Sequence, residues 1–310
     1  MKIVRSLDKL VPGPPSVVIV GVFDGVHLGH QTIMRIVKAD ALERNARAVA
    51  VTFDRLPEEL THPETEARYI TTLDQKLELI AEQGMDQAVV MRLEQRLLDM
   101  PAERFITDVL CEKLRTTQLV VGTNFAFGKG REGNLDLLRR AGHDLGFEVV
   151  GVSPIKLDGF PVSSTVIRRL LSKGDVERAN ELLGRPFALE GEVVPGEGIG
   201  QALGFPTANI RVPERQVIPA KGVYAATVRL DDGRWIGAMN IGTRPTVDGA
   251  GVVVEVYIVG FSGNIYGKKL KLEFHHRLRD ELRFADIEAL KRRIREDVDR
   301  IVAMLRAGNG

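Results

Sequence analysis

The sequence has almost no cysteine, almost no net charge and no long apolar run, and each shortage excludes a class of protein. Cys111 is the single cysteine in 310 residues, so an intramolecular disulfide framework is impossible and a reducing setting is consistent. A net charge of +1 gives no general attraction to nucleic acid. No apolar run reaches transmembrane length, and no signal-peptide core follows Met1. We expect a cytoplasmic protein with no nucleic-acid, membrane or obligate protein partner.

The rest of the composition is that of an ordinary globular protein. Hydrophobic residues make up 44% and charged residues 27% of a length that favours two domains. Strand and helix patterns alternate through residues 1–184, which predicts an α/β domain with a Rossmann-like parallel sheet and ligands beyond the carboxyl ends of its strands. Residues 185–310 read as short strands followed by one helix, which predicts a small antiparallel β-barrel with a closing helix.

Hydrophobic periodicity and turn residues predict the individual elements. The strands expected in the first domain are 17–20, 48–53, 87–91, 118–122 and 148–152, and its helices are 31–44, 72–83, 101–113, 134–145, 165–171 and 176–183. In the second domain, Asp232-Gly233 predicts a hairpin between strands 223–230 and 234–241. Further strands are expected at 252–259 and 270–274, and the last helix is expected to begin after an Asp286 N-cap.

The most informative stretch is Gly21-Val-Phe-Asp-Gly-Val-His-Leu-Gly-His30, between an apolar strand and a helix. His27 and His30 are three residues apart at the helix start, so they share a face. Free N–H groups at that position favour a phosphate, and the three glycines allow close approach of a ligand. Two imidazoles can stabilise the charge that develops on a leaving group. The pattern indicates nucleotidyl transfer, with two histidines in an ordinary turn as the alternative.

Two later segments of the first domain offer hydrogen-bond donors for phosphate. Gly122–Arg131 is rich in glycine, but five residues rather than four separate Gly122 from Gly128, so it is not a P-loop. Ser163-Ser-Thr-Val-Ile-Arg168 opens a helix with three hydroxyls and an arginine one turn later. This suits phosphate, and a plain N-cap explains the local sequence equally well.

The second domain contains oxygen ligands and an isolated carboxylate. Thr207 and Asn209 are two apart in an extended segment, so their side-chain oxygens lie on one side, and such ligands suit Mg²⁺. A turn is the alternative reading of that pattern. Glu255 interrupts a β-branched strand and faces either a site or solvent. His275 and His276 are strand neighbours expected on opposite faces, which argues against one shared metal ion.

Together these motifs resemble the bacterial bifunctional riboflavin kinase/FAD synthetase family over nearly the whole chain. The His-x-Gly-His motif is similar to that of the nucleotidylyltransferase superfamily, and the Gly-x-Asn-Phe-x-Phe-Gly, Ser-Ser-Thr-x-Ile-Arg, Pro-Thr-Ala-Asn and Leu-Arg-x-Glu segments are also present. The resemblance implies that the second domain phosphorylates riboflavin to FMN with ATP. It implies that the first domain adenylylates FMN to FAD, releasing pyrophosphate. Both reactions would use Mg²⁺ with ATP, and flavin would be substrate and product.

The same resemblance implies roles for particular residues. His27, His30 and Arg168 would act in adenylyl transfer, Glu255 would deprotonate the riboflavin 5′-hydroxyl, and Thr207 and Asn209 would hold Mg²⁺. The residues implied to bind nucleotide or flavin are Gly21, Phe23, Asp24, Asn124, Ser163, Ser164, Thr165, Gly196, Gly198, Gly200 and Arg279.

The chain departs from the family pattern at a few positions. A histidine frequent in the family is missing from Thr52-Phe-Asp-Arg-Leu-Pro57, Gln201 replaces a common arginine, and Gly260 replaces a frequent aspartate.

Two alternative functions stay open. One is a flavin-sensing regulator that lacks effective chemistry in one half, although no DNA-binding motif supports it. The other is a kinase whose first domain serves a different acceptor nucleotide.

Overall fold

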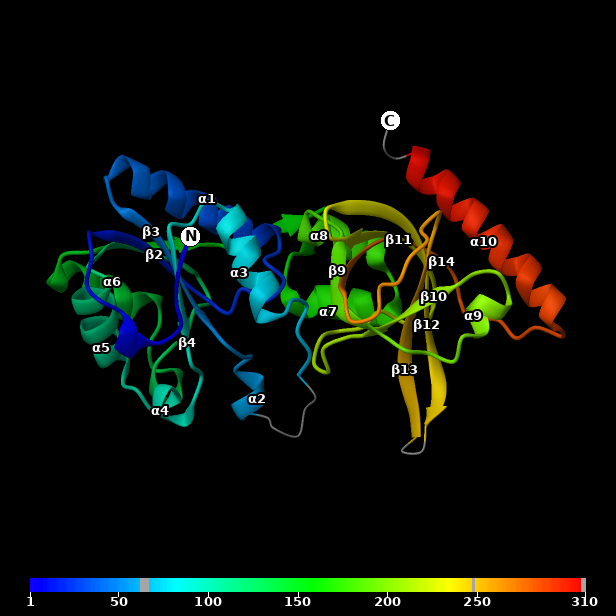
Figure 1. The fold of residues 1–310 in the computed structure, drawn as a ribbon. Coiled ribbons are helices and arrows are strands. Elements are labelled where there is room, and N and C mark those ends of the chain that lie inside the picture. Colours follow the sequence, from blue (N-terminus) through cyan, green and yellow to red (C-terminus); the bar gives the residue numbers. More distant parts are fainter. Residues whose placement is uncertain (62–66, 247–248, 308–310) are drawn as a thin grey trace. The chain divides into compact units, whose positions relative to one another are not determined.

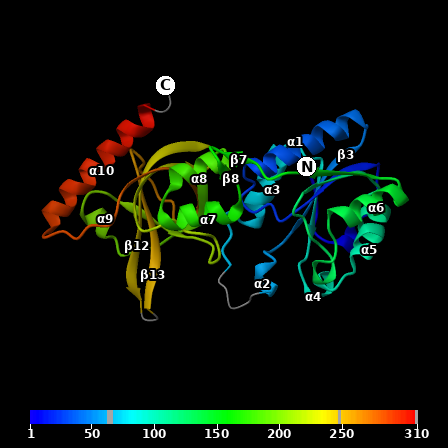
Figure 2. The ribbon, with the colours of Figure 1, turned by 180° about the vertical axis from the view of Figure 1, so that it is seen from behind.

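The protein is seen in a computed structural model that describes residues 1–61, 67–246 and 249–307. The chain forms two compact units, Met1–Ser164 and Thr165–Gly310. Figures 1 and 2 show a sheet with helices in the first unit and a barrel with helices in the second. None of the described helices is long and apolar enough to cross a membrane.

The first unit is built on a six-stranded parallel sheet, as expected, with the order β1-β4-β3-β2-β5-β6. Its strands are β1 (Lys2–Val4), β2 (Ser16–Val20), β3 (Arg47–Phe53), β4 (Gln87–Met91), β5 (Thr116–Gly122) and β6 (Glu148–Val152). The short edge strand β1 was not predicted. The chain runs from β2 toward β3 on one side and resumes with β5 on the other, so a topological switch point lies between β2 and β5.

Helices cover both faces of this sheet (Figure 1). The helical segments of the unit are η1 (Leu7–Lys9), α1 (Leu28–Glu43), α2 (Glu58–Thr61), α3 (Leu73–Glu82), α4 (Gln95–Leu98), α5 (Ala102–Arg104) running into the π-helix Phe105–Lys113, η3 (Lys129–Arg131) and α6 (Leu135–Leu145). Ile19 packs with Met34 of α1, whereas its neighbour Val18 packs in the opposite core with Leu138 of α6. This alternation follows from the two-residue period of a strand. A short hairpin, β7 (Lys156–Leu157) and β8 (Phe160–Pro161), follows β6.

The second unit contains the expected antiparallel barrel, closed in the order β10-β13-β12-β11-β14-β9. Its strands are β9 (Phe187–Val194), β10 (Thr207–Arg211), β11 (Gly222–Leu230), β12 (Gly233–Thr246), β13 (Gly249–Ile258) and β14 (Lys269–Arg279). Its helices are α7 (Ser164–Lys173), α8 (Val176–Leu183), α9 (Ile199–Ala202) and α10 (Ile287–Ala307). The hairpin between β11 and β12 is confirmed, but its loop is Asp231-Asp232, one residue earlier than predicted, because Leu230 pairs with Gly233.

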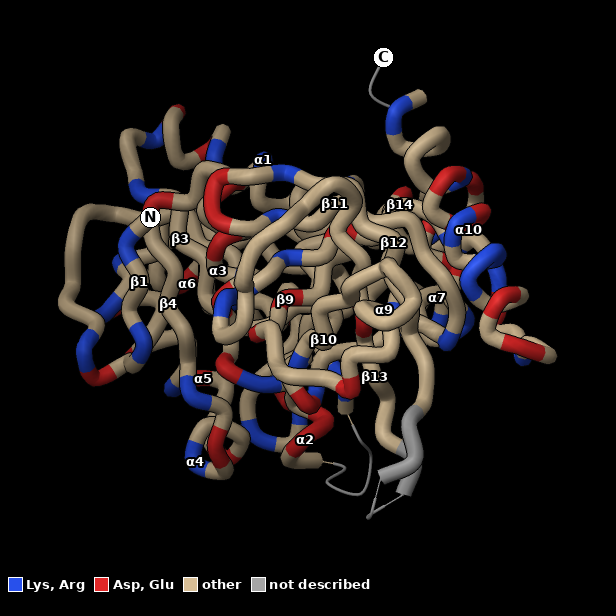
Figure 3. The backbone as a smooth tube through the Cα atoms, turned by 45° about the vertical axis from the view of Figure 1, so that its right-hand side comes forward, with Lys and Arg blue, Asp and Glu red and all other residues tan. Residues whose placement is uncertain are grey.

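Helix α10 closes the unit by packing on the outer wall of the barrel. Its Ile301 is fully buried with Val223 and Ala225 of β11. Asp286 caps the helix as predicted, because its Oδ1 accepts the Ala289 N–H at 2.7 Å. Basic and acidic residues are interspersed along the helix, as Figure 3 shows.

Helices α7 and α8 were predicted to close the first domain, but the structure groups both with the barrel. The Asn180 side chain donates to the Phe274 carbonyl and accepts the Phe187 N–H, and Glu177 accepts the Arg277 N–H. The apolar face of α8 is buried, with Leu182 and other side chains almost fully covered. The chain is therefore divided after Ser164, ahead of the predicted boundary at residue 184. The position of the boundary between the two functions stays a prediction.

The strand β14 also departs from the sequence prediction. Phe274 pairs with Ala226 and His276 pairs with Ala225, so His275 is an extra residue in a β-bulge. The predicted alternation of His275 and His276 onto opposite faces is therefore wrong, because a bulge interrupts the two-residue period.

Candidate active sites

In the first unit, the turn that follows β2 has an unusual backbone. Phe23 and Val26 adopt positive φ angles of 53° and 39°, which are strained for residues with these side chains. A Cβ on Gly21 would lie 2.6 Å from the Phe23 ring, so only glycine fits there. Backbone strain of this kind persists where the surroundings hold it, and it is common at functional sites.

The two histidines predicted to share a face do so. Their rings are stacked at 3.6 Å between centroids and 17° between planes, and Phe23 meets the His30 ring edge-on. Helix α1 begins earlier than predicted because His27, only 6% exposed, is its N-cap and accepts the His30 N–H at Nδ1. In the neutral ring that bond leaves the proton on Nε2, which is then a hydrogen-bond donor.

Asp24 and Ser164 hold this turn in place. Asp24 is 3% exposed, and its carboxylate accepts the backbone N–H groups of Ile70 and Thr71. The Ser164 hydroxyl donates to the Asp24 carbonyl at 2.9 Å. The hydroxyl-rich segment therefore reaches the histidine turn at Ser164, and helix α7 then carries Thr165 and Arg168 into the second unit. These contacts give Asp24 a supporting role, whereas its contact with nucleotide stays a prediction.

Lys76 of α3 is a residue that the sequence analysis missed. It is 5% exposed, and its Nζ donates to the carbonyls of Val22 and Phe53, at the carboxyl ends of β2 and β3. Burial lowers the pKa of Lys76 to about 8, against the opposing effects of Asp24 and Asp54. In the sequence Lys76 is only one charged residue within a helical pattern, and lysines in such patterns usually face solvent.

Asn124 lies in the loop after β5, the strand that pairs with β2. The loop begins with a tight turn in which Phe125 N–H donates to the Gly122 carbonyl, and the Asn124 side chain is exposed. The histidine turn and this loop therefore follow the two strands on either side of the switch point, where ligands bind in open parallel sheets.

In the barrel unit, strand register brings the predicted kinase residues together. Asn209 of β10 is directly opposite Glu255 of β13, which is in turn opposite Asn240 of β12. Directly paired residues point to one face. Since Val254 and Val256 are buried in the barrel, Glu255 and its two amide neighbours lie on the outer wall.

The glycine-rich segment between β9 and β10 lies against Thr207 and Asn209. A Cβ on Gly196 would lie 2.1 Å from the Asn209 amide, and one on Gly200 would lie 2.9 Å from the Thr207 hydroxyl. Gly198 has a φ of 73° and caps helix α9. Gly196 and Gly200 thus lie against the two predicted Mg²⁺ ligands, whereas a Cβ on Gly198 would meet nothing within 4 Å.

Arg279 has a different environment from the one expected. Its Nη2 and Nε donate to Oδ2 of Asp297 on α10 at 2.6 and 2.9 Å, and both side chains are largely buried. This pair ties the end of β14 to the closing helix. The adjacent Glu281 does reach the site, because a Cβ on Gly242 would lie 2.5 Å from its Oε1 and 3.2 Å from Asn240. A contact between Arg279 and a flavin phosphate stays a prediction.

Comparisons with known proteins fit this division. A family profile described as FAD synthetase matches residues 12–166, and one described as riboflavin kinase matches residues 183–305. The bifunctional riboflavin kinase/FMN adenylyltransferase of Pseudomonas fluorescens is 39% identical over 300 residues, which cover 96% of each chain. The chain belongs to the bifunctional riboflavin kinase/FMN adenylyltransferase family. The Escherichia coli K12 protein of the same name is 37% identical, again over 96% of each chain.

A solved structure shares the architecture of this family member. The Streptococcus pneumoniae protein titled macrolide-efflux protein aligns with a TM-score of 0.89 at 26% identity, over 96% of this chain and 97% of that chain. The family accounts for both sets of motifs, and FMN and FAD biosynthesis is its activity.

Proposed function

We propose that the histidine turn at the β2/β5 switch point adenylylates FMN, and that the outer barrel wall at β10 and β13 phosphorylates riboflavin. The observation that supports this is that the two stacked histidines lie in the first unit, whereas Asn209 and Glu255 are paired in the second.

At the histidine turn, a phosphate oxygen of FMN attacks the α-phosphorus of ATP and pyrophosphate leaves. The stacked rings of His27 and His30 donate hydrogen bonds to the charge that develops on the phosphates. The N–H groups at the start of α1 and the amide of Asn124 add further donors. Ser163 and Ser164 of the same unit supply hydroxyls for these phosphates, and the roles of Thr165 and Arg168 stay predictions from the family motif.

At the barrel wall, Glu255 accepts the proton of the riboflavin 5′-hydroxyl as the oxygen attacks the γ-phosphorus of ATP. A primary alcohol is a poor nucleophile at neutral pH, so a positioned carboxylate lowers the barrier. The close approach of Gly196 and Gly200 to Asn209 and Thr207 leaves backbone N–H groups of that segment near the ATP phosphates.

The donor set of the barrel wall fits Mg²⁺. The Thr207 hydroxyl and the Asn209 amide offer oxygen ligands, and Mg²⁺ typically takes few protein ligands together with phosphates and water. When bound, the ion supplies charge neutralisation for the transferred phosphoryl group. The cytoplasmic setting and the absence of nucleic-acid or protein partners belong to the same proposal, with ATP, riboflavin, FMN and FAD as substrates and products.

Chromatography of a reaction with riboflavin, ATP and Mg²⁺ tests the proposal. An FMN peak followed by an FAD peak is the expected result. FMN without FAD would favour a kinase whose first unit serves another nucleotide acceptor. No product from a folded protein would favour a flavin-sensing regulator, and omission of Mg²⁺ from a parallel reaction tests the metal requirement.

A further inference from the structure

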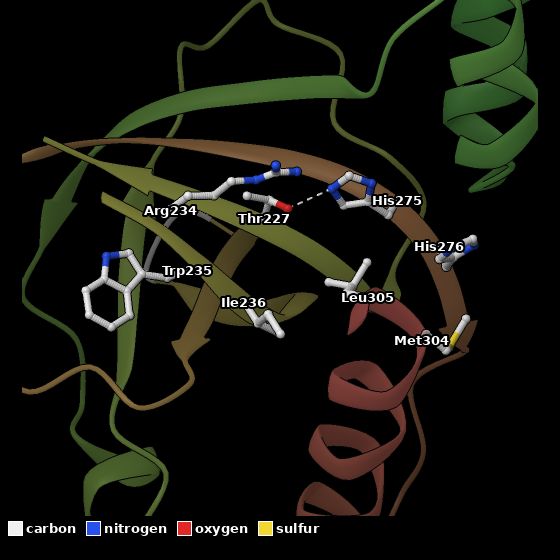
Figure 4. A pocket seen from close by; sticks show the side chains of 8 residues that line it. All are labelled: Thr227, Arg234, Trp235, Ile236, His275, His276, Met304 and Leu305. Carbon is white, nitrogen blue, oxygen red and sulfur yellow. Dashed lines mark hydrogen bonds between the residues drawn. The ribbon is translucent and has the colours of Figure 1, made fainter. Parts of the chain in front are cut away.

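Along β12, the outer wall of the barrel changes from a part covered by α10 to a polar part. Ile236 and Ala238 pack against the cluster that contains Ile301 of α10. Figure 4 shows the pocket at this end of the strand, which the last turns of α10 border. The polar part begins at Asn240, the next residue that points outward, since the residues before and after it are fully buried in the barrel.

Asn240 lies between two carboxylates. On one side it is directly opposite Glu255 of β13. On the other side β11 begins opposite Ile241, so beyond that point β12 is paired only with β13. Glu281, from the segment after β14, reaches this edge. Its Oε1 lies 2.5 Å from the position of a Cβ on Gly242, and the Asn240 Nδ2 lies 3.2 Å from the same position, so a larger residue at 242 would displace the carboxylate.

The chain that carries Glu281 is held in place by two arginines of β14. The Asp280 carbonyl accepts a hydrogen bond from Arg279 Nη1 at 2.9 Å, and the Asp280 carboxylate accepts one from Arg277 Nη2 at 2.6 Å. Arg279 is itself bound to the buried Asp297 of α10. Glu281 is exposed, although the residue before it is fixed. A carboxylate that is open to solvent on a fixed chain is suited to bind a substrate.

Glu255, Asn240 and Glu281 together suit a chain of hydroxyl groups. A carboxylate only accepts hydrogen bonds, an amide donates and accepts them, and a hydroxyl does both. Directly opposed residues have Cβ atoms about 4.5–5.5 Å apart, a distance that a few carbons of a sugar alcohol span. Riboflavin contains such a chain, with secondary hydroxyls between its ring system and the terminal hydroxyl that a kinase phosphorylates.

We propose that Asn240 and Glu281 bind the secondary hydroxyls of the ribityl chain and thereby bring its terminal hydroxyl to Glu255. The proposal rests on the kinase role of Glu255 proposed above, and it adds the residues that select the substrate. Because a polar group that loses its partner in a site is costly, these two residues also reject a flavin whose chain lacks secondary hydroxyls. They bind the chain away from the reacting oxygen, so their loss should change substrate preference.

A substrate analogue tests this in the full-length protein. The analogue is the flavin in which a straight hydroxypentyl chain replaces the ribityl chain, so it keeps the ring system and the terminal hydroxyl but has no secondary hydroxyl. Phosphorylation of each compound with ATP and Mg²⁺ is followed by chromatography, which gives kcat and KM separately. Circular dichroism shows whether each variant is folded.

The wild type should prefer riboflavin by about a hundredfold or more in kcat/KM. Asn240→Leu and Glu281→Leu should each lower kcat/KM for riboflavin by roughly tenfold to a hundredfold, mainly through KM, and should lower it far less for the analogue. Glu281→Gln keeps an accepting oxygen and should restore part of the loss. Glu288→Leu removes an exposed carboxylate from the first turn of α10, and this matched control should change neither substrate.

Equal kcat/KM of the wild type for riboflavin and the analogue would overturn the proposal and leave the kinase function standing. An equal loss on both substrates in the folded Glu281→Leu variant would do the same, and this variant lies outside the barrel strands. Absence of riboflavin phosphorylation by the wild type would overturn the proposed kinase function itself, and this inference with it.

Discussion

The two candidate active sites of this protein are assembled in different ways. The proposed adenylylation site takes both histidines from one ten-residue turn, whose backbone is held by Asp24, Ser164 and Lys76. The proposed kinase site is formed by register, since Asn209, Glu255 and Asn240 meet only because three strands pair in one alignment. A short motif therefore specifies the first site, whereas the second depends on the closure of the whole barrel.

The largest expected effect separates the two chemistries at Glu255. Glu255→Gln keeps the size and hydrogen-bonding capacity of the side chain but removes the basic oxygen, so riboflavin phosphorylation should fall by about a hundredfold to ten-thousandfold. Conversion of supplied FMN to FAD should persist, because a phosphate nucleophile is already ionised. Both rates are measured on one folded preparation, and near-normal kinase turnover would reduce Glu255 to a structural residue.

The reverse separation is expected at the histidine turn. His27→Ala or His30→Ala should slow FAD formation by roughly tenfold to a thousandfold, the range for loss of one stabilising donor. FMN formation from riboflavin should be retained, as chromatography of both products would show. If both activities fell together in a protein with a normal melting profile, the assignment of the two reactions to separate sites would be wrong.

Two fragments test whether the proposed kinase site, which depends on strand register, forms without the first unit. The fragment 165–310 keeps α7 and α8, whereas 185–310 begins at the predicted domain boundary and loses the buried side chains of α8. We expect the longer fragment to fold and phosphorylate riboflavin. The shorter one should lose about 3 kcal/mol or more of its free energy of unfolding, because several large apolar contacts are removed.

Urea unfolding followed by circular dichroism measures this difference. Equal stability of the two fragments would show that α8 contributes little to the barrel and would support the boundary at residue 184. A longer fragment that folds cooperatively but has no kinase activity would contradict an autonomous kinase site.

The smallest effect concerns Lys76, which holds the backbone carbonyls of Val22 and Phe53 next to the histidine turn. Protonated Lys76 donates to the Val22 and Phe53 carbonyls, and its pKa is about 8, so FAD formation should decline as the pH rises through about 8. Lys76→Met should lower the rate by about tenfold and abolish that decline, with Lys76→Arg restoring part of it. Riboflavin phosphorylation provides the control reaction in the same pH series.

The contribution of Lys76 to the free energy of unfolding should rise over the pH range in which FAD formation falls. This difference separates a positioning role from simple unfolding. The pKa of Lys76 is lowered in the folded state from 10.5, so between about 8 and 10.5 the unfolded chain binds more protons than the folded one. The contribution of Lys76 to the free energy of unfolding therefore rises with pH across this interval. A decline in FAD formation that simply followed loss of folded protein would contradict the positioning role.

Local patterns in the sequence were sufficient for the architecture and for most of the motifs. Alternating strands and helices predicted the parallel sheet, and His27 and His30 were expected on one face because helix geometry fixes the spacing of residues three apart. The Asp286 cap followed from the same kind of short-range rule. In the last two cases the interacting groups are three residues apart, so the sequence contains the whole interaction.

Only the tertiary structure decided features that depend on distant partners. Lys76 is buried because β2 and β3 both end beneath α3, and Arg279 is held by Asp297 from a helix that begins later in the chain. Because of the bulge at His275, the neighbouring residues His275 and His276 line the same pocket, contrary to the alternation of a regular strand. Contacts across strands and between elements are set by register and packing, and a linear pattern of residue types does not specify either.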